Sequence, residues 1–248
     1  MITFQSIHPH STLVEENEFY RLYYNADAPY MYDYNCMYLK YQPTLEEFKL
    51  IEKIQLEFHE DMGLEHVKFY WPQDTGFSQP VLDYFIEQDY GVQLLELYAV
   101  HPRDFMGRNP HPDVQFEFVS EDSLSDFKQI SYLQDLDIGK SFTDQKQSLY
   151  DLKFEDPFIR QIIAYLDNEP VGGVDIIENK GTVEIDNLFV NKDRQHQGIA
   201  TALQLFVMKQ AGDRTVILVA DGEDTPKDMY TKQNYIYLGF QAGAQKEL

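Results

Sequence analysis

The sequence predicts a mixed α/β (α+β) protein whose central sheet is flanked by helices. Strand and helix patterns alternate along most of the 248 residues. The hydrophobic content of 43%, with 15% aromatic residues, is typical of globular proteins. Residues 101–115, "HPRDFMGRNPHPDVQ", interrupt both patterns with three prolines and one glycine. We therefore predict an N-terminal α/β domain over residues 1–105 and a second domain over residues 113–248.

The N-terminal region follows a β-α-β-α-β order. In residues 28–41, "APYMYDYNCMYLKY", tyrosines alternate with other residues, which indicates an extended segment. The apolar residues of the stretch 44–61 fall mostly on one face of a helix. A strand at 66–72, a helix at 79–89 and a strand at 92–100 are predicted to follow.

The C-terminal region has a similar alternation. We predict a strand at 114–120 and one or two helices within 121–153. Two strands bracket the turn "NEP", and the pair Gly172-Gly173 in the second strand indicates a bulge or a close contact. The elements that follow are a strand at 182–190, a helix at 198–212, a strand at 214–220, a short helix at 225–233 and a strand at 235–241. The similar orders allow a remote duplication, although no shared motif shows it.

The net charge argues against nucleic acid as a partner. Forty-two acidic residues against 20 basic ones give a formal charge of −22, which repels a nucleic-acid backbone. The same charge is compatible with an acidic cleft for amines or simply with a well-solvated surface. No apolar stretch is long enough to span a membrane and the first residues lack a secretory pattern, so we expect a cytoplasmic protein without a membrane partner. The single cysteine, Cys36, is expected to be a small buried residue.

The strongest local indication of a binding site is a polar turn before a predicted helix. In "NKDRQHQGIATALQLF", residues 191–206, the helix is expected to begin near Gly198, where the first backbone amides lack intrahelical acceptors. Such amides attract an anion, and a glycine lets a phosphate approach the backbone. Lys192 and Arg194 add positive charge nearby. The alternative interpretation is an ordinary connection between a strand and a helix.

The segment "QHQGIA" resembles the Q/R-x-x-G-x-G/A signature of the GCN5-related N-acetyltransferases (GNAT), which also lies between a strand and a helix. The resemblance covers roughly residues 114–248. The N-terminal domain lacks the glycine loop, so if it has the same fold it is a degenerate GNAT half that does not hold the cofactor in this way. The resemblance implies a GNAT-like mixed sheet, acetyl-CoA as co-substrate, no metal, and transfer of an acetyl group to a primary amine by direct attack. It also implies pantetheine contacts from Leu188, Phe189 and Val190. The pyrophosphate contacts would come from Gln195, His196, Gln197, Gly198, Ile199, Ala200 and Thr201.

A second resemblance concerns catalysis. In "EDTPKDMYTKQNY", residues 223–235, Tyr230 occupies the position of the family's general acid, which protonates the departing thiolate. The chain departs from the pattern at Asn234-Tyr235, where the family has Gly-Phe, and at Glu223, where it often has asparagine. Tyr230 could instead pack on a sheet edge.

The acceptor amine must lose a proton before it attacks, so a base is needed. Glu184 and Asp186 lie two residues apart on a predicted strand and therefore share a face, which makes either of them a candidate base. Either could also be a solvated residue or one that orients the substrate.

Other assignments are less favourable. The chain contains no GxxxxGK[ST], GxGxxG or GxSxG motif, and His8 and His10 have no further metal-ligand pattern around them. The N-terminal tyrosines, Tyr30, Tyr32, Tyr34, Tyr38 and Tyr41, are expected to wall an acceptor pocket or to pack as a sheet face. The partner expected is a small-molecule or peptide amine. An exposed edge strand could also pair with a second copy in a homodimer, but no feature of the sequence demonstrates this. The alternative function is a catalytically inactive GNAT-fold protein that binds acyl-CoA or serves as a scaffold.

Overall fold

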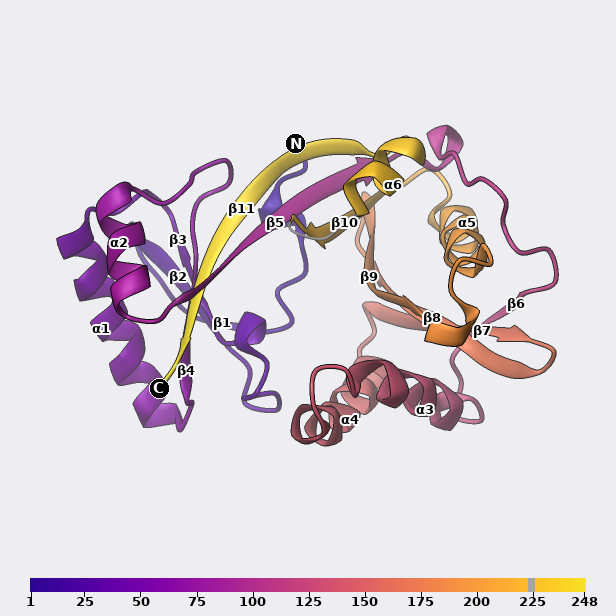
Figure 1. The fold of residues 1–248 in the computed structure, drawn as a ribbon, viewed down its shortest axis with the longest axis horizontal. Helices are drawn as coiled ribbons and strands as arrows, with labels where there is room; N and C mark the ends of the chain where they lie inside the picture. Colours follow the sequence, from indigo (N-terminus) through magenta and orange to yellow (C-terminus); the bar gives the residue numbers. More distant parts are fainter. Residues whose placement is uncertain (223–225) are drawn as a thin grey trace. The chain divides into compact units, whose positions relative to one another are not determined.

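The computed structural model describes residues 1–222 and 226–248, and it separates into two compact units (Figure 1). Among the described residues, the N-terminal unit contains 1–97, 220–222 and 238–248, and the C-terminal unit contains 98–219 and 226–237. The chain therefore completes the first unit only after it has built the second. The sequence-based boundaries differ from this division at the end of the chain, because the last strand pairs within the N-terminal unit.

The N-terminal unit is a sheet with strand order β1-β2-β3-β4-β11-β5. The first three strands are antiparallel, β3 is parallel to β4, and β11 is antiparallel to β4. Its strands and helices are β1 (Thr12–Glu16), β2 (Tyr20–Tyr24), β3 (Met37–Leu39), α1 (Leu45–Met62), β4 (His66–Tyr70), α2 (Gln79–Glu87), β5 (Gly91–Val100) and β11 (Ile236–Glu247). Most of β5 and β11 belongs to this unit, and each strand also runs into the other unit.

Helix α1 confirms the predicted helix of residues 44–61. A capping box closes its start: the Thr44 hydroxyl accepts a hydrogen bond from the Glu47 amide, and the Glu47 carboxylate accepts one from the Thr44 amide. Gly63, with φ at 70°, ends the helix in the left-handed conformation. The helix buries Phe48 and Ile51 in a core that also contains Phe69, Trp71 and Phe85. The spacing of apolar residues in the sequence thus predicts which face of α1 packs against the core.

The tyrosine-rich stretch 28–41 is less extended than predicted. It contains a 3-10 turn at Tyr32–Tyr34 and the three-residue strand β3. The buried side chain of Asn35 closes this loop, because its amide donates to the carbonyl oxygens of Ala28 and Met31 and its oxygen accepts from the Asn25 amide. The hairpin of β1 and β2, which the sequence patterns did not predict, lies beside β3.

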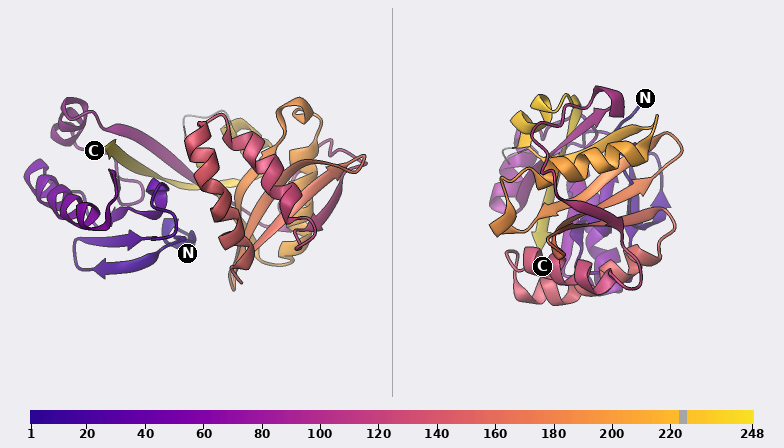
Figure 2. Two further views of the ribbon diagram at one scale, coloured as in Figure 1. Left: turned by 90° about the horizontal axis from the view of Figure 1, so that it is seen from below. Right: turned by 90° about the vertical axis from the view of Figure 1, so that its right-hand side faces the viewer.

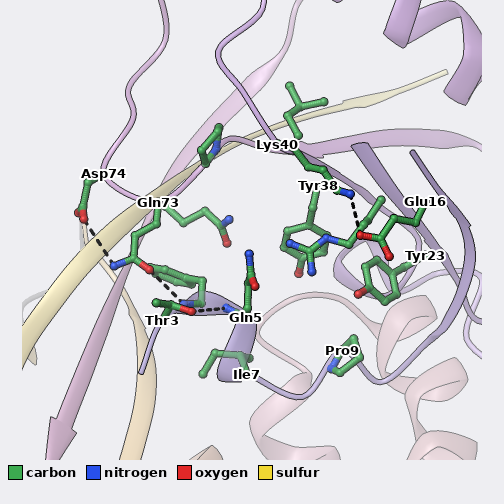
Figure 3. Close-up of a pocket in the computed structure, with 15 residues that line it drawn as sticks. Thr3, Gln5, Ile7, Pro9, Glu16, Tyr23, Tyr38, Lys40, Gln73 and Asp74 are labelled. Atoms are coloured by element: carbon green, nitrogen blue, oxygen red, sulfur yellow. Dashed lines mark hydrogen bonds and ion pairs between the residues drawn. The ribbon is translucent and has the colours of Figure 1, made fainter. Parts of the chain in front are cut away.

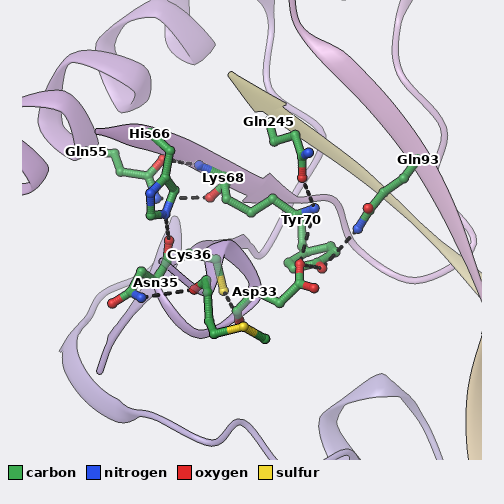
Figure 4. Close-up of polar contacts among 10 residues, drawn as sticks. Asp33, Asn35, Cys36, Gln55, His66, Lys68, Tyr70, Gln93 and Gln245 are labelled. Atoms are coloured by element: carbon green, nitrogen blue, oxygen red, sulfur yellow. Dashed lines mark hydrogen bonds and ion pairs between the residues drawn. The ribbon is translucent and has the colours of Figure 1, made fainter. Parts of the chain in front are cut away.

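A buried polar network lies on β4, on the side of the sheet opposite the apolar core (Figure 4). The ammonium group of Lys68, whose side chain is 1% exposed, donates to the side-chain oxygen of Gln245 at 2.8 Å and lies 3.2 Å from the Asp33 carboxylate. The Tyr70 hydroxyl donates to the same carboxylate at 2.6 Å. Cys36 is fully buried beside this network, as expected, and burial raises the pKa of its thiol. Desolvation lowers the pKa of the neighbouring His66 to about 4, so this histidine is neutral near pH 7.

The strands of the C-terminal unit follow the order β10-β9-β8-β7-β6. Strands β6 to β9 are antiparallel and β9 is parallel to β10. Helices α3 and α4 cover one face of the sheet and α5 covers the other (Figures 1 and 2). The elements are β6 (Gln115–Phe118), α3 (Leu124–Asp135), α4 (Lys140–Glu155), β7 (Ile159–Leu166), β8 (Glu169–Glu178), β9 (Thr182–Val190), α5 (Ile199–Ala211), β10 (Thr215–Asp221) and α6 (Pro226–Lys232).

These elements agree with the predicted order, including two helices within the region 121–153. None of the described helices has both the length and the apolar character needed to cross a membrane.

Candidate active site

Strand β9 bends at a β-bulge in the middle of the predicted site. On β8, Gly173 and Asp175 are two residues apart. Their partners on β9, Phe189 and Asp186, are three residues apart. The extra residue falls near Asn187, whose φ of 49° is in the left-handed region that asparagine tolerates. The pairing of β9 with β10 extends to Ile185 and Leu218, and no further pair joins the two strands among the described residues, although β9 continues to Val190. The two parallel strands therefore diverge after Ile185.

The bulge also decides where the side chains of β9 point. Asp186 and Phe189 are three residues apart, which places them on opposite faces of a regular strand, yet both contact the layer of α3 and α4. Phe189 packs against Phe127 and Tyr150 in a small core, and Asp186 binds Lys153 of α4. The Phe189 ring is thus committed to the core, and only its backbone remains for a ligand.

The two glycines of β8 allow β9 to approach closely at the bulge. A Cβ atom on Gly172 would lie 2.6 Å from the carbonyl oxygen of Phe189, and one on Gly173 would lie 2.6 Å from the ring of Phe127. The predicted close contact is confirmed. The glycines support the same part of β9, residues 188–190, that the resemblance assigns to the pantetheine.

The turn after β9 presents free backbone amides. It contains a 3-10 turn at Lys192–Arg194 and leads to Gly198, which precedes the first turn of α5 with φ at 84° and without a side-chain cap. Within the described parts of the chain, the backbone amides of residues 196–201 donate to no protein acceptor. Helix α1 differs, since its own Glu47 satisfies its start. Six consecutive amides near a helix start can bind an anion.

The basic residues of this turn already have partners. Lys192 lies 2.5 Å from Asp137 and Arg194 lies 3.3 Å from Glu169. The side chains of Lys192, Asp137 and Glu169 are at least half exposed, and such surface pairs contribute at most about 1 kcal/mol. The two cations could therefore exchange these partners for a phosphate at small cost.

Gly198 has a second role that the sequence did not indicate. A Cβ atom at this position would lie 2.2 Å from the carbonyl oxygen of Asn109, and the His111 amide donates to the Gly198 carbonyl at 3.2 Å. The connecting segment 105–113 thus packs directly on the start of α5. Glycine is required here both by its positive φ and by this close approach.

The two candidate bases occupy different surroundings. Asp186 accepts a hydrogen bond from Lys153 at 2.8 Å, and Lys153 donates equally closely to Asp175, which is fully buried and lies opposite Asp186 on β8. Burial raises the pKa of Asp175, and the neighbouring Lys153 opposes this shift. Glu184 is 5% exposed and lies opposite Ile177. The sequence analysis did not identify Lys153 and Asp175. An aspartate within the apolar run "VGGVDII" could have indicated a buried carboxylate that needs a cation.

Tyr230 lies on α6 and packs against the rings of Tyr98 and Tyr235, with centroids 5.1 Å and 5.4 Å away. Burial raises the pKa of its hydroxyl, which therefore keeps its proton near neutral pH. Tyr235 donates to the side-chain oxygen of Gln204 on α5 at 3.0 Å, and the Asn234 amide group donates to the carbonyl oxygen of Asp104. The residues that replace the family's Gly-Phe pair thus anchor the end of α6. Glu223 lies outside the described residues.

The remaining candidates lie in the N-terminal unit. His10 stacks on Tyr34, and His8 contacts the His10 ring edge-on. In the part of the chain that the structure describes, no cluster of three or more potential metal ligands occurs. Of the N-terminal tyrosines, Tyr34 is buried and Tyr38 stacks on Tyr70.

Comparison with known proteins finds a family model for each half of the chain. Residues 124–235 match the acetyltransferase (GNAT) family model, and residues 2–98 match a domain of unknown function, DUF5613. A functionally unknown conserved protein from Staphylococcus epidermidis is 32% identical over 99% of this chain and 98% of its own, with a TM-score of 0.91.

Two GCN5-related N-acetyltransferases have the same fold at low identity. The protein from Sphaerobacter thermophilus has a TM-score of 0.63 at 15% identity, covering 94% of this chain and 82% of its own. The protein from Kribbella flavida has a TM-score of 0.62 at 11% identity, covering 95% and 89%. No curated protein matches the chain.

Proposed function

Because the C-terminal half of this chain belongs to the GNAT acetyltransferase family, we propose that the protein is an acetyl-CoA-dependent N-acetyltransferase acting on a primary amine. The observation that carries the proposal is the run of free amides at residues 196–201, beside a strand that diverges from its parallel neighbour. An ordinary helix start leaves about four amides without intrahelical acceptors, so the two further free amides and the diverging strands are what distinguish this turn. We further propose a cytoplasmic location and a small-molecule or peptide amine as acceptor.

The residues present fit acetyl-CoA, which supplies an acetyl group activated as a thioester when it is bound. The amides of residues 196–201 would hold the pyrophosphate. The backbone of Leu188, Phe189 and Val190, beyond the end of the β9–β10 pairing, would hold the pantetheine arm. Phe189 contributes through its backbone alone, since its ring is in the core.

The proton transfers are proposed for three side chains. Glu184 or Asp186 would accept a proton from the acceptor ammonium group, so that a neutral amine can attack. Lys153 holds the Asp186 carboxylate in one orientation. Tyr230 would donate its proton to the departing thiolate, and its raised pKa keeps that proton available near neutral pH.

The alternative function is an acyl-CoA-binding or scaffold protein without turnover. It is favoured by the departure from the family pattern at Asn234-Tyr235 and by the engagement of Asp186 with Lys153. It predicts the same cofactor binding but no acetylation of any amine.

Thermal unfolding with and without acetyl-CoA tests the binding site. At about 100 times its dissociation constant, a ligand stabilises the folded state by roughly 2.7 kcal/mol, which raises the melting temperature by several degrees. Gln197→Glu places a negative charge beside the amides and is compatible with a helix start, so it should abolish the shift without harming the fold. Gln210→Glu makes the same change near the other end of α5 and should keep the shift.

Measurement of CoA release over a panel of amines separates the two functions. Turnover that falls about a hundredfold in Tyr230→Phe, with unchanged binding of acetyl-CoA, supports catalysis by Tyr230. Binding without turnover favours the alternative. An equal thermal shift in the parent and in Gln197→Glu, or none in either protein, contradicts the proposed cofactor site.

A further inference from the structure

The N-terminal unit contains a cavity that acetyl transfer does not explain. Its volume is about 660 Å³, within the range of roughly 300–1,000 Å³ that is usual for small-molecule sites. All its lining residues belong to this unit. It lies on the face of β1, β2 and β3 that is opposite the apolar core, and Figure 3 shows its labelled residues.

Strands β1, β2 and β3 carry the polar and aromatic side chains that line the cavity. Glu16, Arg21 and Tyr38 are direct neighbours across β1, β2 and β3, so their side chains lie on one side of the sheet. Tyr23 and Lys40 follow two residues after Arg21 and Tyr38 and share that side. The alternate residues Tyr20 and Leu22 point into the core.

Aromatic and apolar groups form the walls. The Tyr38 ring stacks on Tyr70 with centroids 4.9 Å apart, and it meets the edge of the Tyr23 ring at 5.5 Å. Across the cavity from these rings lie Gln5, Ile7 and Pro9 (Figure 3). Their segment is anchored by the Phe4 amide, which donates to the Gln73 side chain at 3.1 Å.

The strand face of the cavity carries two cations, Arg21 and Lys40, beside one carboxylate, Glu16. Lys40 and Glu16 pair at 2.6 Å, and Asp74 lies exposed at the rim, where it accepts a hydrogen bond from the Phe240 amide. Arg21 lies opposite the Glu16 carboxylate across the strands and is attracted by its charge, but it forms no ion pair with it, and among the described residues the guanidinium group has no hydrogen-bond acceptor. In a chain with a net charge of −22, two cations beside one carboxylate on the same strand face are a specific feature.

We propose that this cavity binds a small monocarboxylic acid with an aromatic or apolar body. A carboxylate matches the guanidinium of Arg21 in shape and in charge, since planar carboxylates accept two parallel hydrogen bonds from arginine. One excess positive charge on the strand face favours a monoanion over a phosphate dianion. The rings of Tyr23 and Tyr38 would contact the body of the ligand. The proposal is independent of acetyl transfer by the C-terminal unit.

Saturation-transfer NMR on the full chain tests the site with benzoate, phenylacetate, hydrocinnamate and hexanoate. At least one acid should bind, whereas its neutral amide and phenyl phosphate should bind more weakly. Arg21→Gln should weaken the acid at least about tenfold, the effect of losing one charge-assisted hydrogen bond. Arg103→Gln removes an exposed arginine and should leave binding unchanged. Both variants should keep the thermal shift with acetyl-CoA.

A second pair of variants covers the case in which Arg21→Gln does not fold. Ile7→Trp fills the cavity from its wall and should abolish binding, whereas Leu50→Trp, on an exposed position of α1, should not. The proposal is overturned if none of the acids binds the parent, if Arg21→Gln or a folded Ile7→Trp binds as well as the parent, or if phenyl phosphate binds more tightly than every acid.

Discussion

Lys153 is the residue on which the charge balance of the candidate active site depends. Its ammonium group joins α4 to β8 and β9 by donating to Asp175 and Asp186 at 2.8 Å each. Asp175 is fully buried and relies on this cation, whereas Asp186 is 35% exposed and can also be solvated. The fold and the proposed chemistry therefore depend on the same side chain.

Replacing Lys153 by methionine should lower the free energy of unfolding by about 3–5 kcal/mol near neutral pH, because a buried carboxylate then lacks its counterion. Urea unfolding measures this loss. Lys128→Met is the control: Lys128 pairs with Asp151 at 2.6 Å, but that pair is partly exposed, so the loss should stay below about 1 kcal/mol.

The pH dependence distinguishes lost charge from lost packing. Burial already raises the pKa of Asp175 in the folded state, so folding favours its protonated form and this contribution to stability falls as the pH rises through that pKa. Without Lys153 the pKa of Asp175 should rise further. The deficit of Lys153→Met should therefore shrink at lower pH, and adding Asp175→Asn should recover part of it near neutral pH. A deficit that is independent of pH and is not relieved by Asp175→Asn would contradict this account.

At the scale of elements, the candidate site depends on how β8 and β9 approach each other. The bulge near Asn187 turns β9, and the glycines of β8 leave room for the backbone of residues 188–190. The apolar and small residues of both strands are visible in the sequence. The extra residue in the register is not, because it arises from the pairing of two segments.

Gly172→Ala should destabilise the C-terminal unit by about 1–3 kcal/mol, since its methyl group would lie 2.6 Å from the Phe189 carbonyl oxygen. It should also weaken acetyl-CoA binding, because residues 188–190 are displaced. Gly181→Ala, which meets no atom within 4 Å, is the control and should change neither property. Thermal unfolding and calorimetric titration measure the two effects, and equal behaviour of both variants would exclude the proposed role of the close contact.

At the scale of the whole molecule, the chain returns to its first unit at the end. Residues 243–247 of β11 pair with β4, and Ala242 and Ala244 lie in the N-terminal core. The Trp71 amide donates to the Ala242 carbonyl at 2.8 Å. The N-terminal unit therefore requires residues that lie more than a hundred positions after its first 97 residues.

Deletion of residues 238–248 should unfold the N-terminal unit, because β4 loses its partner and the core loses part of its wall. The single tryptophan, Trp71, is fully buried in this unit and reports the change through its fluorescence. Its emission should shift to longer wavelength in the truncated chain, whereas deletion of residues 247–248 should leave it unchanged. Unshifted emission after the longer deletion would show that the unit folds without β11.

The sequence by itself determined the periodic elements and the glycine turn. Helix α1, strand β9 and the start of α5 were predicted because apolar spacing, caps and a glycine before a helix act within a few residues of chain. The assignment of residues 195–201 followed from a motif of the same short range.

Only the tertiary structure decided the features that join distant segments. Lys153 meets Asp175 and Asp186, Asn109 packs on Gly198, and β11 completes the first unit. The hairpin of β1 and β2 places Arg21 beside the cavity. Pairing between strands and burial of charge depend on which segments meet in three dimensions, and a pattern read along one strand or helix does not contain that information.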